Sequence, residues 1–162
     1  IYKVDFPYLE KCPAYILGWQ RRFWQGSHDH RGTPENPGRV ATLIAQAGSR
    51  CDGMAYRVTA EEFIHLDHRE KNGYLRHEVP VFLINESGQQ VKKLGIIYIA
   101  DEENSAYLGE DSEEAIAAHI ANCRGPSGDN SEYLIMLDEA LAELGVVDPH
   151  ISQIRWHLSN LI

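Results

Sequence analysis

The separation of strands and helices along the chain is the feature that most constrains its fold. Short apolar runs punctuated by glycine and proline fill the first half, whereas the last third carries apolar residues at helical spacing. The expected strands are 14–19, 40–46, 54–58, 78–84 and 94–100. Because strands and helices do not alternate strictly, this order predicts an α+β fold with a largely antiparallel sheet or barrel.

Three helices are expected in the last third, over 111–123, over 129–144, and from Asp148-Pro149 onward. Asp111 and Glu114 form a capping box at the start of the first of them. The apolar stripes expected to be buried comprise Ile116, Ile120, Tyr133, Leu137, Leu141, Leu144, Ile151, Ile154, Leu158 and Leu161. Between the first two strands lies a polar loop, 26–38, and loops of this length are usually functional or mobile.

Size and charge limit the classes of function. The chain has 162 residues, and we expect residues 1–162 to form a single domain with a sizeable core. The formal net charge of −9 disfavours a nucleic-acid backbone or an anionic membrane as partner. A local basic patch, comprising Arg21, Arg22, Arg31 and Arg39, would still suit a small anionic ligand.

Cysteine usage and hydropathy indicate the compartment. The three cysteines, Cys12, Cys51 and Cys123, are widely spaced and form no Cys-x-x-Cys pair, which argues against a disulfide framework or a structural zinc site. No apolar run approaches the length of a membrane span, and no signal peptide is visible. We therefore expect a cytoplasmic protein.

Glu70 lies where a further short helix is expected to end. Thr59 and Glu62 form a capping box at the start of this helix, and Asn72-Gly73 can adopt the left-handed turn that ends it. A carboxylate in the last turn faces the negative end of the helix dipole, which disfavours the ionised form and raises the pKa. Glu70 is therefore a candidate proton carrier near neutral pH; the alternative is a solvated side chain paired with a neighbouring basic residue.

Other groupings of reactive residues lack their usual partners. The segment His28-Asp29-His30 and the pair His65 and His68 have no further zinc ligands at a recognised spacing, so we expect no metal. The sequence also has no hydrolase elbow and no glycine-rich phosphate loop. The turn at 125–128 could present free helix amides to a carboxylate, or it could be an ordinary capped loop.

Four separated segments resemble one family. They are RRFWQGSHDHRGTPENPGRV at 21–40, REKNGY at 69–74, YIADEENSAYLG at 98–109 and GPSGDNSEYL at 125–134. Together they are similar to the hallmark motifs of the ChaC family, the glutathione-specific γ-glutamylcyclotransferases, and they follow the family's order over nearly the whole chain. The resemblance implies a γ-glutamylcyclotransferase-like fold, a small mixed β-barrel flanked by helices. It also implies an enzyme that cleaves glutathione to 5-oxoproline and cysteinylglycine.

The resemblance implies site residues as well. In the family, the proton-handling glutamate occupies the position that Glu70 matches here. The family begins with a strand and a Tyr-Gly-Ser-Leu loop whose backbone amides hold the γ-glutamyl group, and Ile1 is the part of that binding segment that this sequence contains. Either the protein is longer at its N-terminus, or this chain lacks part of its first strand and its site, and we expect the chain as written to be weakly active or inactive.

The implied reaction needs no cofactor, because the α-amine of the γ-glutamyl group attacks the γ-carbonyl of the same molecule. Correct folding of the substrate supplies an effective molarity of about 10⁵ M or more. Glu70 would take a proton from the amine and deliver it to the leaving nitrogen, and backbone amides of the family's loop would stabilise the oxyanion. Arg22 and Tyr133 are candidates for contacting polar groups of the substrate; the alternatives are a structural ion pair for Arg22 and a core position for Tyr133.

Two other functions compete with this one. The first is a cyclotransferase that acts on other γ-glutamyl amines. The second is a non-catalytic module that binds a small ligand or a partner. The oligomeric state does not follow from the sequence.

Overall fold

The computed structural model describes residues 4–69 and 73–161. Its main sheet is antiparallel in the order β2-β1-β3-β4, with β1 Glu10–Ser27, β2 Gly38–Arg57, β3 Leu75–Ile84 and β4 Gln90–Ile99. The helices are α1 Ala60–Arg69, α2 Glu113–Ala121, α3 Asn130–Glu143 and α4 Pro149–Ser159, and a short hairpin, β5 Arg124–Gly125 and β6 Gly128–Asp129, precedes α3. The predicted α+β class with an antiparallel sheet is confirmed.

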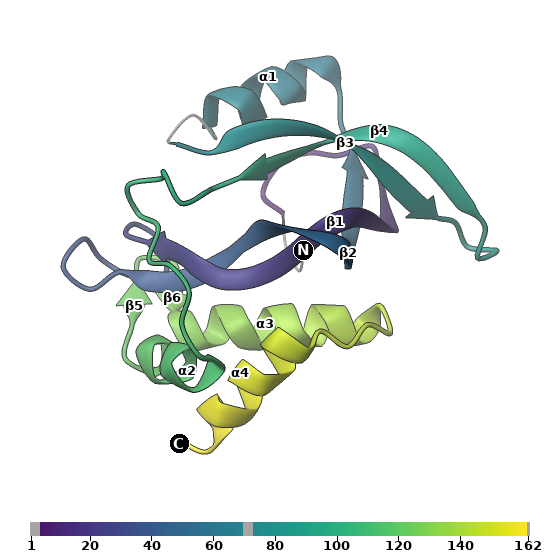
Figure 1. Cartoon of the computed structure of the whole chain (residues 1–162). Helices are drawn as coiled ribbons and strands as arrows, with labels where there is room; N and C mark the ends of the chain where they lie inside the picture. Colours follow the sequence, from purple (N-terminus) through teal and green to yellow (C-terminus); the bar gives the residue numbers. More distant parts are fainter. Residues whose placement is uncertain (1–3, 70–72, 162) are drawn as a thin grey trace.

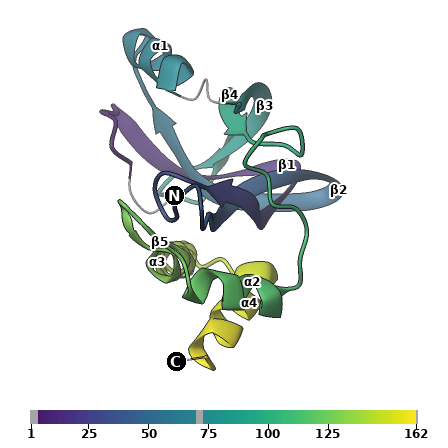
Figure 2. The same ribbon diagram turned by 90° about the vertical axis from the view of Figure 1, so that its left-hand side faces the viewer.

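The elements are layered around a long ribbon formed by β1 and β2. Helices α2, α3 and α4 cover one face of the ribbon, and the β3–β4 hairpin, with α1 beyond it, lies over the other face (Figure 1). The view turned by 90° shows the same order of layers (Figure 2). Two register shifts in the β1–β2 pairing, after Leu17 and after Arg22, locally disrupt the ladder and bend the ribbon.

The larger core lies between the ribbon and the three C-terminal helices. Phe23 of β1 is completely buried there, because all three helices direct apolar side chains at it. Those side chains are Ile116, Ala117 and Ile120 of α2, Leu134, Leu137 and Leu141 of α3, and Ile151, Ile154 and Leu158 of α4. Burial of this apolar area is the main force that attaches the helices to the sheet.

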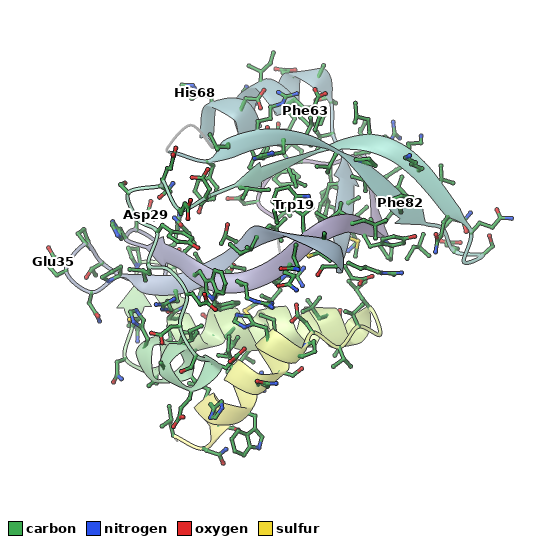
Figure 3. All side chains as sticks on the ribbon, in the orientation of Figure 1. Trp19, Asp29, Glu35, Phe63, His68 and Phe82 are labelled. Atoms are coloured by element: carbon green, nitrogen blue, oxygen red, sulfur yellow. The ribbon has the colours of Figure 1, made fainter. Side chains whose placement is uncertain are left out.

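A smaller core lies between the ribbon and the β3–β4 hairpin. It is built from Ile16, Cys51 and Val79, with the half-buried side chains of Trp19, Leu43, Val81 and Ile97 packed against it. Figure 3 shows Trp19 in the space between the two layers. At one end of this core, Phe82 stacks on Tyr15 with their ring centroids 4.9 Å apart. The register between β1 and β3 covers two residue pairs, Ala14–Leu83 and Tyr15–Phe82.

The predicted barrel is not closed by the strands of the described residues. β2 and β4 form the two edges of the sheet, and the recorded pairings do not join them. After β4, the segment 101–109 instead runs beside the C-terminal half of β1, where one bridge joins Gln25 to Tyr107. The observed form is therefore an open, bent sheet.

Several predicted boundaries need correction. The runs 40–46 and 54–58 belong to one continuous strand, β2, because β1 is long enough to pair with both of them. Helix α2 is capped by Ser112, whose hydroxyl accepts from the Ala115 N–H, rather than by Asp111. Leu161 is 56% exposed, since α4 ends before it.

Other helix signals are confirmed. The Thr59 hydroxyl accepts from the Glu62 N–H at 3.2 Å at the start of α1, and Gly73 has the left-handed φ of +89°. The Asp148 carboxylate caps α4, which begins with Pro149 as predicted. Among the residues that the structure describes, none of the helices is long and apolar enough to cross a membrane.

Candidate active site

The structure brings together segments that lie far apart in the sequence, with the C-terminal half of β1 at their centre. The Gly26 N–H donates to the Ala106 carbonyl at 2.8 Å, and the N–H groups of Leu108 and Gly109 both donate to the Trp24 carbonyl. A Cβ at Gly26 would overlap the Ala106 carbonyl oxygen, so this approach requires glycine. The segments 21–40 and 98–109, which the sequence singled out separately, are therefore direct neighbours.

The loop 28–37 packs against the turn that precedes α3. The Ser127 N–H donates to the His30 carbonyl at 2.9 Å, and a Cβ at Gly125 would overlap that carbonyl. The Arg31 guanidinium donates to the Asp129 carbonyl at 3.0 Å and to the Glu132 carboxylate at 2.7 Å. Asp29 and Glu35, which are labelled in Figure 3, belong to this loop and lie at the end of the ribbon. The segment 125–134 is thereby fixed to the segment 21–40.

Two side chains of α3 cover the outer edge of β2. The side-chain oxygen of Asn130 accepts from the Arg39 N–H, and its NH₂ group donates to the Arg39 carbonyl, both at 2.8 Å. The Tyr133 hydroxyl accepts from the Ala41 N–H at 3.3 Å. Asn130 and Tyr133 are three residues apart, so they lie on the same face of the helix. Backbone groups at this edge are therefore paired with side chains rather than with another strand.

Arg39 links three segments from the interior. Its guanidinium donates to the Phe23 carbonyl at 2.9 Å and to the Gly109 carbonyl at 2.8 Å, and it lies 3.8 Å from the Asp111 carboxylate. Burial lowers the pKa of Arg39, while Asp111 acts in the opposite direction. The side chain stays charged, because arginine begins far above neutral pH. Its role in this geometry is to hold β1 and the segment 101–111 together.

Gly73, with which the structure resumes in the segment 69–74, is also held in place. The Gln25 side-chain NH₂ donates to the Asn104 side-chain oxygen at 3.1 Å. The same oxygen accepts from the Ala106 N–H at 2.9 Å. A Cβ at Gly73 would lie 2.5 Å from the NH₂ group of Asn104, so Gly73 is packed directly against this amide. Gln25 and Asn104 therefore connect β1 to the chain three residues after Glu70.

The predicted site residues are not all visible in this arrangement. Glu70 and Ile1 lie outside the described residues. Tyr133 is half-buried between the Phe23 ring, at a centroid distance of 5.7 Å, and the Arg31 guanidinium, at 5.9 Å. Its position at the edge of the helix-side core agrees with the packing alternative, although a tyrosine hydroxyl can donate as well as accept.

Arg22 lies elsewhere, beside a cavity of about 250 Å³. Its guanidinium donates to the Arg21 carbonyl at 2.7 Å and to the Gln20 side-chain oxygen at 2.8 Å, so its partners are neutral oxygens rather than the ion pair that was the alternative to substrate contact. The cavity is also lined by His150 and does not include Tyr133. Within the described part of the chain, Arg22 and Tyr133 thus belong to different surroundings.

His150 is buried beside this cavity in its neutral form. Its Nε2 atom accepts from the Phe23 N–H at 3.1 Å, which requires that this nitrogen carry no proton. The Nδ1 atom lies 3.2 Å from the Glu113 carboxylate, so the single ring proton is placed there. Burial lowers the pKa of His150, and the hydrogen bond to Glu113 opposes the shift only in part. His150 is thus a structural connection between α4 and β1.

Side chains that could bind a metal do not cluster in the described part of the chain. In the ranges 4–69 and 73–161, no group of three or more His, Cys, Asp and Glu side chains is placed to hold a metal ion. His30 lies 3.1 Å from the Ser127 hydroxyl, and His65 lies 3.5 Å from the Glu62 carboxylate. These contacts agree with histidines that form ordinary hydrogen bonds or ion pairs.

Gln25, Asn104 and Asn130 were not expected from the sequence as functional positions. Each is polar and lies in one of the four motif segments, yet no local spacing reveals that it will contact a residue far away in the chain. Gln25 and Asn130 are 2% and 0% exposed. Burial of a polar side chain is the signal that identifies them, and it becomes visible only in three dimensions.

Comparisons with known proteins agree with the four motifs. A family model described as ChaC-like protein matches residues 1–160. Gamma-glutamylcyclotransferase 2-3 of Arabidopsis thaliana is 42% identical over 171 residues, which cover 100% of this chain and 85% of that protein. Glutathione-specific gamma-glutamylcyclotransferase 1 of Danio rerio is 41% identical over 163 residues, with 96% and 82% covered. The crystal structure of a glutathione-specific γ-glutamyl cyclotransferase from yeast superposes with a TM-score of 0.82 at 30% identity, covering 95% of this chain and 91% of that one.

Proposed function

The chain belongs to the ChaC-like protein family, and we propose that it is a glutathione-specific γ-glutamylcyclotransferase that releases 5-oxoproline and cysteinylglycine. The observation that carries this proposal is the agreement between the motifs and the relatives. Proteins named as γ-glutamylcyclotransferases, two of them as glutathione-specific, are 35–42% identical to the chain over at least 95% of its length. The four motif segments also contact one another in the structure, as expected if they serve one site.

The reaction requires the protein to position the substrate and to transfer protons. The α-amine nitrogen of the γ-glutamyl group bonds to the γ-carbonyl carbon and closes a five-membered ring. The bond from that carbon to the cysteine nitrogen breaks, and the electron pair leaves with the nitrogen. An ammonium cannot attack and an amide anion leaves poorly, so one proton must be removed and one supplied.

We assign both proton transfers to Glu70. In the chain, Glu70 follows the described end of α1 at Arg69 and precedes Gly73, whose φ is left-handed. A glutamate that takes the proton from the amine holds it as a carboxylic acid and can then return it to the departing nitrogen. Loss of such a group typically lowers the rate by about 10²- to 10⁴-fold.

We retain weaker assignments for the other predicted residues. Tyr133 is proposed to contact a polar group of the substrate, which is supported by its hydroxyl and by the neighbouring Arg31 cation. Arg22 and Ile1 remain candidates for substrate contact on the basis of the resemblance. For Arg22 the support is the adjoining cavity and a guanidinium that pairs with neutral oxygens.

Three broader features belong to the same proposal. We treat residues 1–162 as one γ-glutamylcyclotransferase-like domain whose sheet corresponds to the barrel of the family. Its support is the bend of the β1–β2 ribbon and the return of the segment 101–109 to β1.

We place the reaction in the cytoplasm, because Cys12, Cys51 and Cys123 are all free thiols. The net charge of −9 supports a small-molecule substrate rather than a nucleic acid or an anionic membrane.

The test measures 5-oxoproline release from glutathione by the wild type and by Glu70→Gln, both in a version that carries the family's first strand and loop. We expect release by the wild type, and loss of release with retained glutathione binding in the variant. A Glu70→Gln protein with near-normal turnover would refute the assignment of Glu70. Binding without turnover in the wild type would favour a binding module, and faster release from γ-glutamyl-lysine than from glutathione would favour a cyclotransferase for other γ-glutamyl amines.

A further inference from the structure

The cavity beside Arg22 has more positive than negative side chains in its wall. Its volume is about 250 Å³, and it lies where residues 20–22 of β1 and 49–52 of β2 meet residues 146–150 at the start of α4. Three arginines and two aspartates line it, which leaves one positive charge because His150 is neutral. The whole chain carries a formal net charge of −9, so this is a local reversal of sign. A cavity of this sign attracts small anions.

Two of the three arginines are paired with the aspartates. Arg21, which is 5% exposed, lies 3.2 Å from the Asp148 carboxylate and donates to the Asp52 carbonyl at 2.6 Å. Arg50 donates to both carboxylate oxygens of Asp52, at 2.8 Å for the shortest contact, and lies over the Tyr15 ring at 3.7 Å. These contacts hold the two side chains in fixed positions and neutralise their charges within the protein.

Arg22 is the lining arginine whose charge is not matched in this way. Among the ion pairs between described residues, none includes Arg22, and its two hydrogen bonds go to neutral oxygens. The Glu113 carboxylate is held instead by the Nδ1 atom of His150. A hydrogen bond from its own backbone N–H lowers the pKa of Glu113 most, and the positive charge of Arg22 adds to this shift. A guanidinium has five N–H donors, so three remain for a further acceptor.

The groups around Arg22 add a second donor. Arginine can only donate, so the Gln20 atom that it contacts is the amide oxygen, and the Gln20 NH₂ group therefore faces the Ser49 hydroxyl at 3.0 Å. Because the Ser49 oxygen accepts this bond, the hydroxyl proton can be donated elsewhere. A guanidinium and a hydroxyl from two neighbouring strands suit the oxygen atoms of a carboxylate or a phosphate. The volume is below the range of about 300–1,000 Å³ that is usual for drug-sized ligands, which limits the ligand to a small anion.

We propose that this cavity binds a small oxyanion, a carboxylate or a phosphate, through the Arg22 guanidinium and the Ser49 hydroxyl. Binding of a free anion goes beyond the proposed reaction and does not depend on it. A carboxylate of glutathione is the second possible source of the same chemistry, and that source rests on the proposed function. In both cases the ligand connects β1 to β2 beside the start of α4.

The experiment follows backbone amide NMR shifts during titration with sodium phosphate. A parallel titration with sodium chloride at equal ionic strength separates binding from charge screening. We expect saturable shifts at residues 20–22 and 49–52, with a dissociation constant of about 1–10 mM for a few charge-assisted hydrogen bonds. Glutathione is titrated into Glu70→Gln, so that turnover does not disturb the measurement, with and without phosphate.

Three variants test the assignment of the ligand contacts. Arg22→Gln should weaken phosphate binding by about 10- to 100-fold, because it removes the charged donor, and Ser49→Ala by about 2- to 10-fold. Arg57→Gln is the matched control: it removes the same charge from the end of β2, where the guanidinium pairs with the exposed Glu10 carboxylate. We expect less than a twofold change for this control. If Arg22→Gln does not fold, the comparison of Ser49→Ala with Arg57→Gln still decides the inference.

The outcomes distinguish the two sources of the ligand. Shifts with phosphate that glutathione does not displace indicate a site for a separate anion, whereas displacement by glutathione indicates a subsite for its carboxylate. If neither compound shifts the amides of residues 20–22 and 49–52 beyond the chloride control, or if Arg22→Gln and Arg57→Gln weaken binding equally, the inference is wrong. A wild type without 5-oxoproline release would overturn the proposed function and leave the phosphate result standing.

Discussion

Replacing Asn130 by alanine tests whether α3 stabilises the fold by pairing the edge of β2. The change removes two hydrogen bonds of 2.8 Å, both to the backbone of Arg39. Asn130 is 0% exposed and Arg39 is 5% exposed, so water cannot easily replace the lost partner. Each lost bond costs about 1 kcal/mol, and up to about 3 kcal/mol where a buried group stays unpaired. We therefore expect the free energy of unfolding to fall by about 2–4 kcal/mol.

The measurement is equilibrium unfolding in urea. With a slope of about 2 kcal/mol per molar urea, the expected loss lowers the midpoint by about 1–2 M. Asn122→Ala is the control, because its exposed amide donates only to the Ala118 carbonyl of its own helix end, and we expect a change of about 0.5 kcal/mol or less. A loss below about 1 kcal/mol for Asn130→Ala would mean that the edge groups find other partners, and the reasoning from buried pairing would be wrong.

Three further predictions concern individual contacts. Ser112→Ala should lower the stability by about 1 kcal/mol, because the serine hydroxyl caps α2; an unchanged midpoint in urea unfolding would contradict the observed cap. Gly26→Ala should cost about 1–3 kcal/mol, since the added Cβ overlaps the Ala106 carbonyl, and an unchanged melting temperature would contradict this packing. Burial lowers the pKa of His150 in the folded chain. As the pH falls through about 6.5, the unfolded chain therefore binds a proton at this histidine while the folded chain does not. Stability from this residue is therefore present above about pH 6.5 and lost as the pH falls below it, and His150→Gln should flatten this part of the pH–stability curve; an equal slope in both proteins would show that His150 is not responsible.

The sequence predicted those elements whose signals are local. The start of α1 at Thr59 and the start of α4 at Asp148-Pro149 both depend on residues three positions apart or fewer, and both are confirmed. The cap of α2 was placed one residue too early, because Asp111 and Ser112 are both good capping residues in sequence. Only the backbone geometry decides between them: the Asp111 carboxylate accepts from the Ser112 N–H, and the Ser112 hydroxyl is left to cap the helix.

Long-range features could not be predicted in the same way. The continuity of β2 depends on pairing with β1 along its whole length, and the glycines inside it resemble turn signals when read alone. Gln25 contacts Asn104 across 79 positions, and Asn130 contacts Arg39 across 91. The four motifs indicated that these segments matter, but the resemblance alone did not show which of their polar residues meet.

The short register between β1 and β3 has a consequence for motion. The β3–β4 hairpin joins the ribbon through two residue pairs and a small apolar cluster, whereas the C-terminal helices share a larger core with it. Segments with few buried contacts can open with a free energy below that of global unfolding. Opening of the hairpin should therefore cost less free energy than opening of the helical layer.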